Sequence, residues 1–149
     1  MTYSLAFSQA VMVVIYVADK VRQGIYDFVP TKELSQDLNI PRPSAVKILN
    51  SLNKAGIIET REGAKGGIRL GISASEVTVL DIFEAIESGR ALFHKNYQFK
   101  VTGKKPDRAR QAVDSIFAAA ENAMKAELEG DSIEDLLETL KSPLKKVDL

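Results

Sequence analysis

Three glycines within residues 63–67 limit the fold of this chain more than any other local feature. The run Gly-Ala-Lys-Gly-Gly cannot continue a helix. It suits a hairpin tip, where a positive φ or a close approach of two backbones favours glycine. Short isoleucine-rich runs flank it at 57–61 and 68–70. The sequence therefore predicts two short strands joined by a turn, with Lys65 at the tip.

Two short helices are predicted before this hairpin. The first has Leu34 and Leu38 on one face, and Thr31 has the position of its N-cap. The second runs from about 42 to 55 and ends at Gly56, which suits the left-handed conformation that stops a helix. Its apolar stripe follows the helical period: Ala45, Ile48, Leu49 and Leu52. Its opposite side is rich in hydrogen-bond donors and free of acidic residues.

Further helices are predicted on both sides of this unit. The apolar spacing of 5–21 favours a helix, although its β-branched content leaves a strand as the alternative. Thr78 with Asp81, and Ser132 with Asp135, have the spacing of capping boxes that begin two short helices. The first of these has an apolar face made of Leu80, Ile82, Phe83 and Ile86.

A long helix is predicted from 107 to about 128. Its apolar stripe would be exposed in a monomer, so we expect it to form a dimer interface. The residues assigned to dimerisation are Val113, Ile116, Phe117, Ala120, Met124 and Leu128. Asp114, Glu121 and Lys125 are expected to point away from the stripe, the last two as an i, i+4 ion pair.

The predicted fold is mainly α with a small β-hairpin. We expect a winged helix-turn-helix unit at 1–89, a connecting segment at 90–106, and a dimerisation helix with a short C-terminal helix at 107–149. The tail after Ser142 is predicted to fray.

Charge is distributed unevenly along a neutral chain. Basic and acidic residues both number 20, so a basic average does not argue for a nucleic-acid partner. Residues 1–75 nevertheless carry nine basic and six acidic side chains, a net charge of +3. A basic run at 90–110 precedes the acidic residues crowded into 107–138. The position of these charges relative to the motifs must therefore indicate the partner.

Several functions are excluded by composition. The chain has no cysteine, so it has no disulfide, thiolate nucleophile or cysteine-ligated metal. His94 is the single histidine, which excludes a multi-histidine metal site, and no carboxylates are paired for acid–base catalysis. We expect no enzyme activity, no metal and no cofactor. The longest apolar stretch, 10–18, is too short to cross a membrane, so we expect a cytoplasmic protein.

The helix at 42–55 and the basic hairpin after it are typical of a winged helix-turn-helix. A helix fits the major groove of B-DNA, and a basic tip suits phosphates or the minor groove. The residues assigned to the major groove are Arg42, Pro43, Ser44, Val46 and Lys47. Those assigned to the wing are Arg61, Lys65, Gly66 and Arg69. The alternative is a protein-interaction scaffold that keeps the fold without reading DNA.

Residues 55–58, 61–70 and 77–87 resemble the signature of the Rrf2 family of winged helix-turn-helix regulators. The resemblance covers about 1–140. It implies a homodimeric bacterial transcription regulator, whose long helix crosses its partner and whose second short helix reads the major groove of an operator. Residues 91–94 and 122–128 are most similar to the cysteine-free, YwnA-like branch. We expect a repressor that occludes a promoter.

Two departures limit what the resemblance implies. Family members that sense through an iron–sulfur cluster place three cysteines in the segment corresponding to 90–106, where this chain has none. A cluster is therefore not expected. The family's basic pair near the N-terminus is also missing from 4–9, which leaves backbone N–H groups or the hydroxyl of Ser8 for phosphate contact there.

The segment 90–106 also contains a candidate effector pocket. Its lining would be Phe93, His94, Tyr97 and Phe99, three aromatic rings beside the lone histidine. Packing between the DNA-binding unit and the long helix is the alternative role for these rings. The sequence names no effector, whether small molecule or protein.

Overall fold

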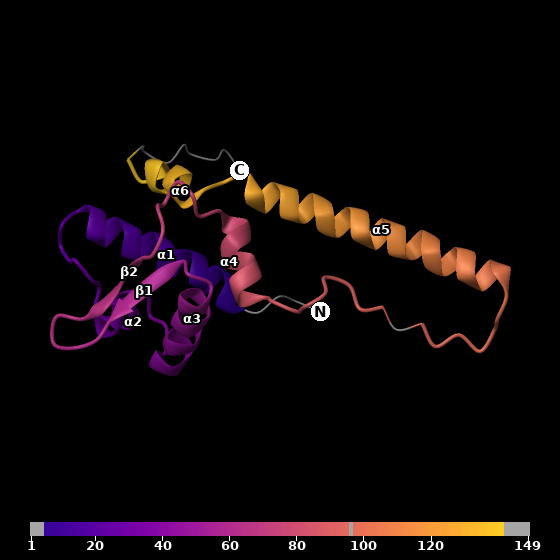
Figure 1. The fold of residues 1–149 in the computed structure, drawn as a ribbon, viewed down its shortest axis with the longest axis horizontal. Helices are drawn as coiled ribbons and strands as arrows, with labels where there is room; N and C mark the ends of the chain where they lie inside the picture. The colour runs from indigo at the N-terminus through magenta and orange to yellow at the C-terminus, as the bar shows by residue number, and fades with distance from the viewer. Residues whose placement is uncertain (1–4, 96, 142–149) are drawn as a thin grey trace, which may run out of the picture.

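The structure is a computed structural model that describes residues 5–95 and 97–141. The frayed tail predicted after Ser142 lies outside these ranges. The elements in chain order are α1 (Leu5–Arg22), α2 (Thr31–Asp37), α3 (Arg42–Lys54), β1 (Ile58–Arg61), β2 (Gly67–Leu70), α4 (Val79–Ile86), α5 (Lys104–Glu129) and α6 (Ile133–Thr139). Figure 1 shows a winged unit made of α1 to α4 and the hairpin, with α6 packed on it and α5 extending away. None of the described helices is long and apolar enough to cross a membrane.

α1 is the central helix of the winged unit. It contacts α2, α3, α4, α6 and β2, and its buried stripe consists of Ala10, Val13, Val14, Val17 and Ala18. Valine has a low helix propensity, so packing on all these neighbours stabilises the helix more than local preference does. The helix predicted for 5–21 is confirmed, and the alternative strand is wrong.

A tight turn joins α2 to α3. Asn39 has a φ of 51°, and the backbone N–H of Ile40 donates to the carbonyl of Ser35 at 3.0 Å. The hydroxyl of Ser35 donates in return to the carbonyl of Ile40 at 2.5 Å. The predicted N-cap at Thr31 is wrong: the cap is Pro30, already extended, and no side chain bonds the first turn of α2.

α3 follows its prediction closely. Ala45, Ile48, Leu49 and Leu52 are buried. Gly56 follows the helix with a φ of 76°. The expected apolar stripe is thus confirmed, and it holds α3 against α1, α2 and α4.

The wing is an antiparallel hairpin attached to the loop before α2. In β1 and β2, Ile58 pairs with Leu70 and Arg61 pairs with Gly67. On the edge of β2 that faces away from β1, Val29 and Ile68 exchange two backbone hydrogen bonds of 2.8 and 2.9 Å. Gly67 has a φ of 151°, and a Cβ there would lie 2.3 Å from the Val29 carbonyl oxygen. The glycine therefore allows the wing to approach the loop that precedes the helix-turn-helix.

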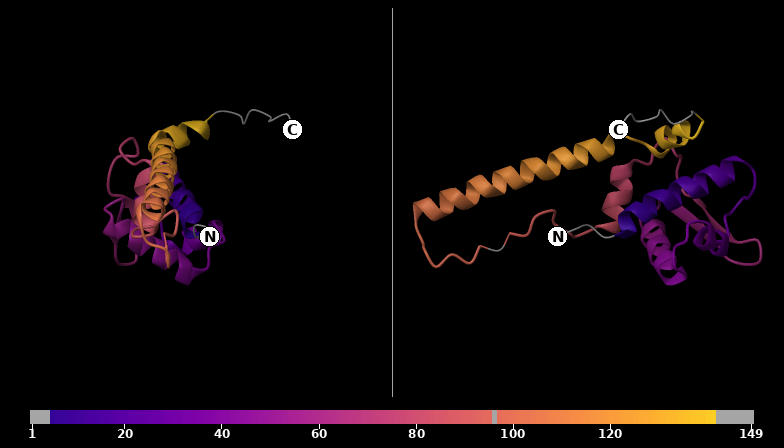
Figure 2. Two further views of the ribbon diagram at one scale, coloured as in Figure 1. Left: turned by 90° about the vertical axis from the view of Figure 1, so that its right-hand side faces the viewer. Right: turned by 180° about the vertical axis from the view of Figure 1, so that it is seen from behind.

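Beyond α4 the chain forms an arm. α4 begins at the predicted capping box of Thr78 and Asp81. The segment after it runs outward, and α5 leads back toward α6 (Figures 1 and 2). α5 begins at Lys104, three residues before its predicted start. Pro106 is compatible with this start because the backbone N–H groups of the first turn have no partner within the helix. The connecting segment is correspondingly shorter than 90–106.

Asp114, Glu121 and Lys125, predicted to point away from the apolar stripe of α5, are instead half-buried on the same side as most of that stripe. The Tyr97 hydroxyl donates to Oδ1 of Asp114 at 3.1 Å. Nζ of Lys125 lies 3.8 Å from Oε1 of Glu121, which confirms that ion pair, and 3.4 Å from Oε1 of Glu84 on α4. These side chains face the connecting segment and α4, because both lie along the same side of α5.

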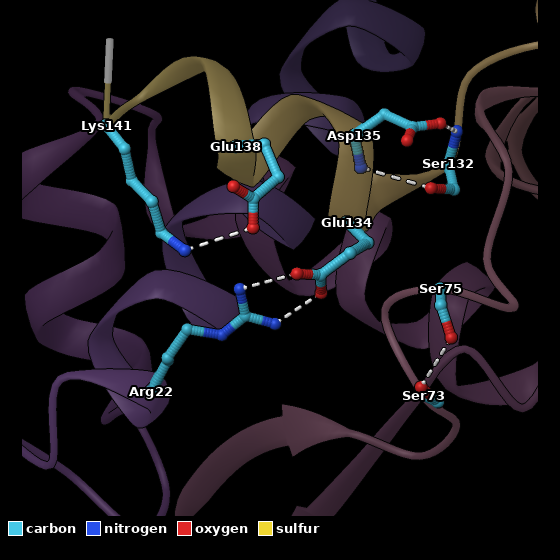
Figure 3. Close-up of polar contacts among 8 residues, drawn as sticks. All are labelled: Arg22, Ser73, Ser75, Ser132, Glu134, Asp135, Glu138 and Lys141. Atoms are coloured by element: carbon cyan, nitrogen blue, oxygen red, sulfur yellow. Dashed lines mark hydrogen bonds and ion pairs between the residues drawn. The ribbon is translucent and has the colours of Figure 1, made fainter.

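α6 returns the chain to the winged unit. It begins at the predicted capping box of Ser132 and Asp135, and Ile133 and Leu137 are buried against the core. The guanidinium of Arg22, at the end of α1, donates two hydrogen bonds of 3.0 and 2.5 Å to the carboxylate of Glu134 (Figure 3). This bidentate pair joins α1, near the start of the chain, to α6, near its end.

We predict that Gly67→Ala lowers the free energy of unfolding by about 3 kcal/mol, because the new methyl group meets backbone and the φ is strained. Gly24→Ala is the matched control: its φ is 74°, with no other atom within 4 Å, so only the backbone cost of about 1 kcal/mol is expected. Urea denaturation measures both. Equal losses would contradict the close approach of wing and loop.

We also predict a pH-dependent contribution from the pair of Arg22 and Glu134. The hydrogen bond from Arg22 lowers the pKa of the Glu134 carboxyl below its ordinary value. The pair therefore stabilises the fold at neutral pH, and this contribution is lost as the pH falls through the lowered pKa. The stability difference between wild type and Glu134→Gln should narrow as the pH falls below the ordinary glutamate pKa of about 4.3. Glu76→Gln, at an exposed carboxyl, is the matched control for loss of one charge and should leave the free energy of unfolding at neutral pH close to that of wild type.

Candidate nucleic-acid interface

The N-terminal half of α3 presents an exposed surface without acidic residues. Arg42, Pro43, Ser44 and Lys47 are exposed, and Val46 is 41% exposed. No side chain caps the first turn, and that turn contains no acidic residue. The positive end of the helix dipole and two cationic side chains therefore face outward together, an arrangement that favours an anionic partner.

Further along α3 the donor-rich side is less open than the sequence indicates. Ser51 is half-buried, and its hydroxyl donates to the carbonyl of Lys47 at 3.2 Å. This bond lies within the helix itself. Asn50 and Lys54 remain exposed, so the outward donors extend along α3 beyond its N-terminal end.

The wing carries its basic side chains in a defined arrangement. One guanidinium nitrogen of Arg61 donates to the carbonyl of Lys65 at 2.8 Å, across the hairpin loop. Arg69 forms an ion pair with Glu59 on the opposite strand. Lys65 is exposed at the tip. The charge of Arg69 is therefore partly balanced, whereas Arg61 and Lys65 add to the positive field of the wing.

Gly66 has a structural role in the wing loop. A Cβ at this position would lie 2.1 Å from the carbonyl oxygen of Arg61. The loop thus folds back so tightly on β1 that only glycine fits. Gly66, a residue assigned to the DNA interface from the sequence, is therefore required by the geometry of the turn.

α3 and the wing lie on the same side of the winged unit. In Figures 1 and 2 both are on the side opposite α6, in views that differ by half a turn about the vertical axis. α3 also contacts β1 directly. The two elements that carry the predicted site residues are therefore neighbours in the fold.

The connecting segment packs along α5 through its aromatic side chains. The rings of Phe93 and Phe117 are stacked, with centroids 4.3 Å apart. Tyr97 and Phe99 lie beside the guanidinium of Arg110, whose Cζ is 5.8 and 5.5 Å from the two ring centroids. Desolvation and the hydrogen bond to Asp114 raise the pKa of the Tyr97 phenol.

A recess of about 270 Å³ lies between this segment and α5. It is lined by Ala91, Phe93, His94, Lys95, Phe117 and Glu121. Two of the four predicted pocket residues, Phe93 and His94, therefore line it, and Tyr97 and Phe99 do not. The hypothesis of an effector pocket stays a prediction, with a changed lining.

The arrangement of α1 to α4, the hairpin and α5 is the fold of a winged helix-turn-helix protein with a long C-terminal helix. IscR of T. potens is similar to it with a TM-score of 0.70 and 16% identity, covering 99% of this chain and 94% of that chain. CymR (YrzC), the global cysteine regulator of B. subtilis, has a TM-score of 0.68 and 19% identity, covering 93% and 98%.

Sequence comparison identifies the family. The Rrf2 family, described as an iron-dependent transcriptional regulator, matches residues 3–139, and the chain belongs to it. Protein aau3 of Rhizobium meliloti is 30% identical over 123 residues, 78% of this chain and 79% of that protein. An HTH-type transcriptional regulator of Aquifex aeolicus is 26% identical over 87 residues, 58% of this chain and 56% of its own length. This chain thus matches little more than half of the Aquifex protein. Family and fold are those of DNA-binding transcriptional regulators rather than enzymes.

The residues present do not fit the iron that the family description implies. The sequence has no cysteine. Within the described ranges, no group of three or more histidine, cysteine, aspartate or glutamate residues is arranged to hold a metal ion. The lack of cysteine agrees with the cysteine-free branch of the family that the sequence resembles.

Sequence reasoning missed three contacts around these sites. Phe28 lies against the wing arginines, Glu59 pairs with Arg69, and Arg110 packs on the aromatic rings of the connecting segment. The contact between Glu59 and Arg69 could have been predicted, because cross-strand pairing in the expected hairpin places these two residues opposite each other. The other two contacts join segments far apart in sequence and leave no local pattern.

Proposed function

We propose that this protein is a sequence-specific DNA-binding regulator that acts as a homodimer and represses transcription by occluding a promoter. The observation that carries the proposal is the exposed, acid-free N-terminal half of α3 beside a basic wing. α3 has the dimensions to enter the major groove, where Arg42, Ser44 and Lys47 meet base edges and Val46 meets a thymine methyl group.

The wing supplies positioning contacts in this proposal. Arg61 and Lys65 form none of the ion pairs found among the described residues, whereas Arg69 shares its charge with Glu59. Phosphate contacts fix the register of a protein on duplex DNA but carry no sequence information. Base preference therefore resides in α3, and the wing sets overall affinity and its salt dependence.

The arm supports the proposed homodimer. None of the residues of α5 is fully buried in the single chain, and Ile116 is 64% exposed. The predicted dimerisation stripe divides into two parts. Val113, Phe117, Met124 and Leu128 are half-buried against the chain itself, whereas Ile116 and Ala120 are exposed. A partner would therefore cover mainly the side of Ile116 and Ala120.

The charges of α5 support antiparallel pairing of two copies. Its first two turns carry Lys104, Lys105, Arg108 and Arg110 against a single acidic residue, Asp107, and its last turn carries Glu127 and Glu129. This order opposes the helix dipole, which favours acidic residues at the N-terminus and basic residues at the C-terminus. An antiparallel partner would place each basic end beside an acidic end, so the unfavourable charges of one helix are balanced by the other.

Control would act on the spacing of the two recognition helices. Two copies of α3 must reach half-sites about one helical turn of DNA apart, roughly 34 Å, or a multiple of that. A small molecule or protein that binds one arrangement more tightly shifts the population toward it. Because the chain has no cysteine, we propose that this signal does not involve a cysteine-ligated iron–sulfur cluster.

DNA binding is tested by selecting fragments of the host genome on the purified protein at low salt. We expect enrichment of a roughly palindromic site, and Arg42→Ala should lose about 1–3 kcal/mol of discrimination at one base position. Lys65→Ala should weaken binding to all sequences and reduce the salt slope by about 1. Lys141→Ala, just after the end of α6, is the control and should change neither. No enrichment would favour the interaction scaffold instead.

Homodimerisation is tested by analytical ultracentrifugation. We expect wild type to dimerise, and Ile116→Asp to weaken the dimer about a hundredfold or more, because each copy would bury a carboxylate in the proposed interface. Ser115→Asp adds the same charge at an exposed neighbouring position of α5 and should leave the dimer intact. A wild-type chain that stays monomeric would refute the proposed assembly.

A further inference from the structure

The ring of Phe28 contacts both arginines of the wing. Cζ of Arg61 lies 4.3 Å from the ring centroid, and Cζ of Arg69 lies 4.5 Å from it. The arginines belong to different strands, β1 and β2, whereas Phe28 belongs to the loop before α2. We call these three residues the Phe28–arginine cluster.

Phe28 is buried without belonging to the main core. Its side chain is only 9% exposed, yet it is not a member of the contiguous cluster of buried apolar residues. Its neighbour Val29 is fully buried within that cluster and pairs with Ile68 of β2. Successive side chains of an extended segment point to opposite sides, so this pairing places Phe28 away from the core, on the side of the two arginines.

Stacking on a ring leaves a guanidinium free to bind an anion. A guanidinium that stacks on a ring uses its face, whereas its N–H donors point outward from its edge. One of these donors on Arg61 binds the carbonyl of Lys65, so the position of Arg61 is linked to the wing loop. Glu59 fixes Arg69 on its other side. Both arginine side chains are therefore ordered before any partner arrives.

We propose that Phe28 is a positioning residue for the wing: it holds Arg61 and Arg69 in the orientation in which they meet the phosphate backbone of DNA. This inference rests on the proposed DNA-binding function. A long cationic side chain that is already ordered loses less conformational entropy on binding than a free one. Phe28 thus raises affinity without itself contacting DNA.

The test compares Phe28→Leu with Phe28→Tyr on the duplex enriched by the wild type. The leucine variant keeps an apolar side chain but loses the ring, and we expect about tenfold weaker binding with a reduced salt slope. The tyrosine variant keeps the ring and should bind like wild type. In an Arg61→Ala/Arg69→Ala background, Phe28→Leu should have no further effect, because the residues it positions are gone.

Side-chain NMR tests the cluster without DNA. The δ-protons of Arg61 and Arg69 should be shifted by the ring current in wild type and in Phe28→Tyr, and this shift should be lost in Phe28→Leu. Thermal unfolding of the same samples checks that the leucine variant is folded at the temperature of the binding assay.

The outcomes separate this inference from the function on which it rests. If wild type binds DNA and folded Phe28→Leu binds equally well, Phe28 has no positioning role and the inference alone is overturned. An equal loss in the double-arginine background also overturns it, since Phe28 would then act by another route. If wild type binds no DNA at any salt concentration, the proposed function fails and the inference fails with it, whatever the NMR shifts are.

Discussion

Two backbone hydrogen bonds between Val29 and Ile68 fix the wing against the loop before α2, in addition to its packing on α1 and α3. They extend the two-stranded hairpin by one short segment and fix its register relative to the loop that leads into α2. Val29 is directed into the core by this pairing, and Phe28 is directed toward the basic surface. A glycine at 67 permits the approach. The geometry of the wing thus depends on a contact outside the wing itself.

The molecule separates its two proposed tasks between parts with different physical properties. The winged unit has a continuous core around α1, so the basic surface formed by α3 and the hairpin is held on a rigid support. The arm has a helix without a fully buried residue, and its contacts with the connecting segment are aromatic stacking, hydrogen bonds and ion pairs. Changes in the arm can therefore alter the spacing of two copies without repacking the surface proposed to read DNA.

Local patterns in the sequence were sufficient for most elements. Helical spacing predicted α3 and its buried stripe, and paired polar residues predicted the caps at Thr78 and Ser132. These features involve residues within one or two turns of each other, so their physics is local. The glycine run likewise predicted the hairpin, because few conformations accept three glycines in such a short segment.

The sequence did not predict contacts between distant segments. Thr31 has the right chemistry for an N-cap. The residue with the extended backbone of an N-cap is Pro30, however, so Thr31 is the first residue of the helix. The polar side of α5 faces the connecting segment because that segment folds back along it, which no helical period encodes. Only Phe93 and His94 of the predicted pocket line a recess, since Tyr97 and Phe99 pack on Arg110 instead.

Because α5 has an exposed face, the order of the arm depends on the concentration of the protein if two copies associate through that face. A helix that buries little within its own chain gains most of its order from whatever covers it, and for a self-associating protein the covering surface is supplied by mass action. In the proposed homodimer, dilution would therefore destabilise the arm while the winged unit stays folded. For such a molecule, the number of copies per cell is itself a variable that sets the fraction competent to occupy paired half-sites.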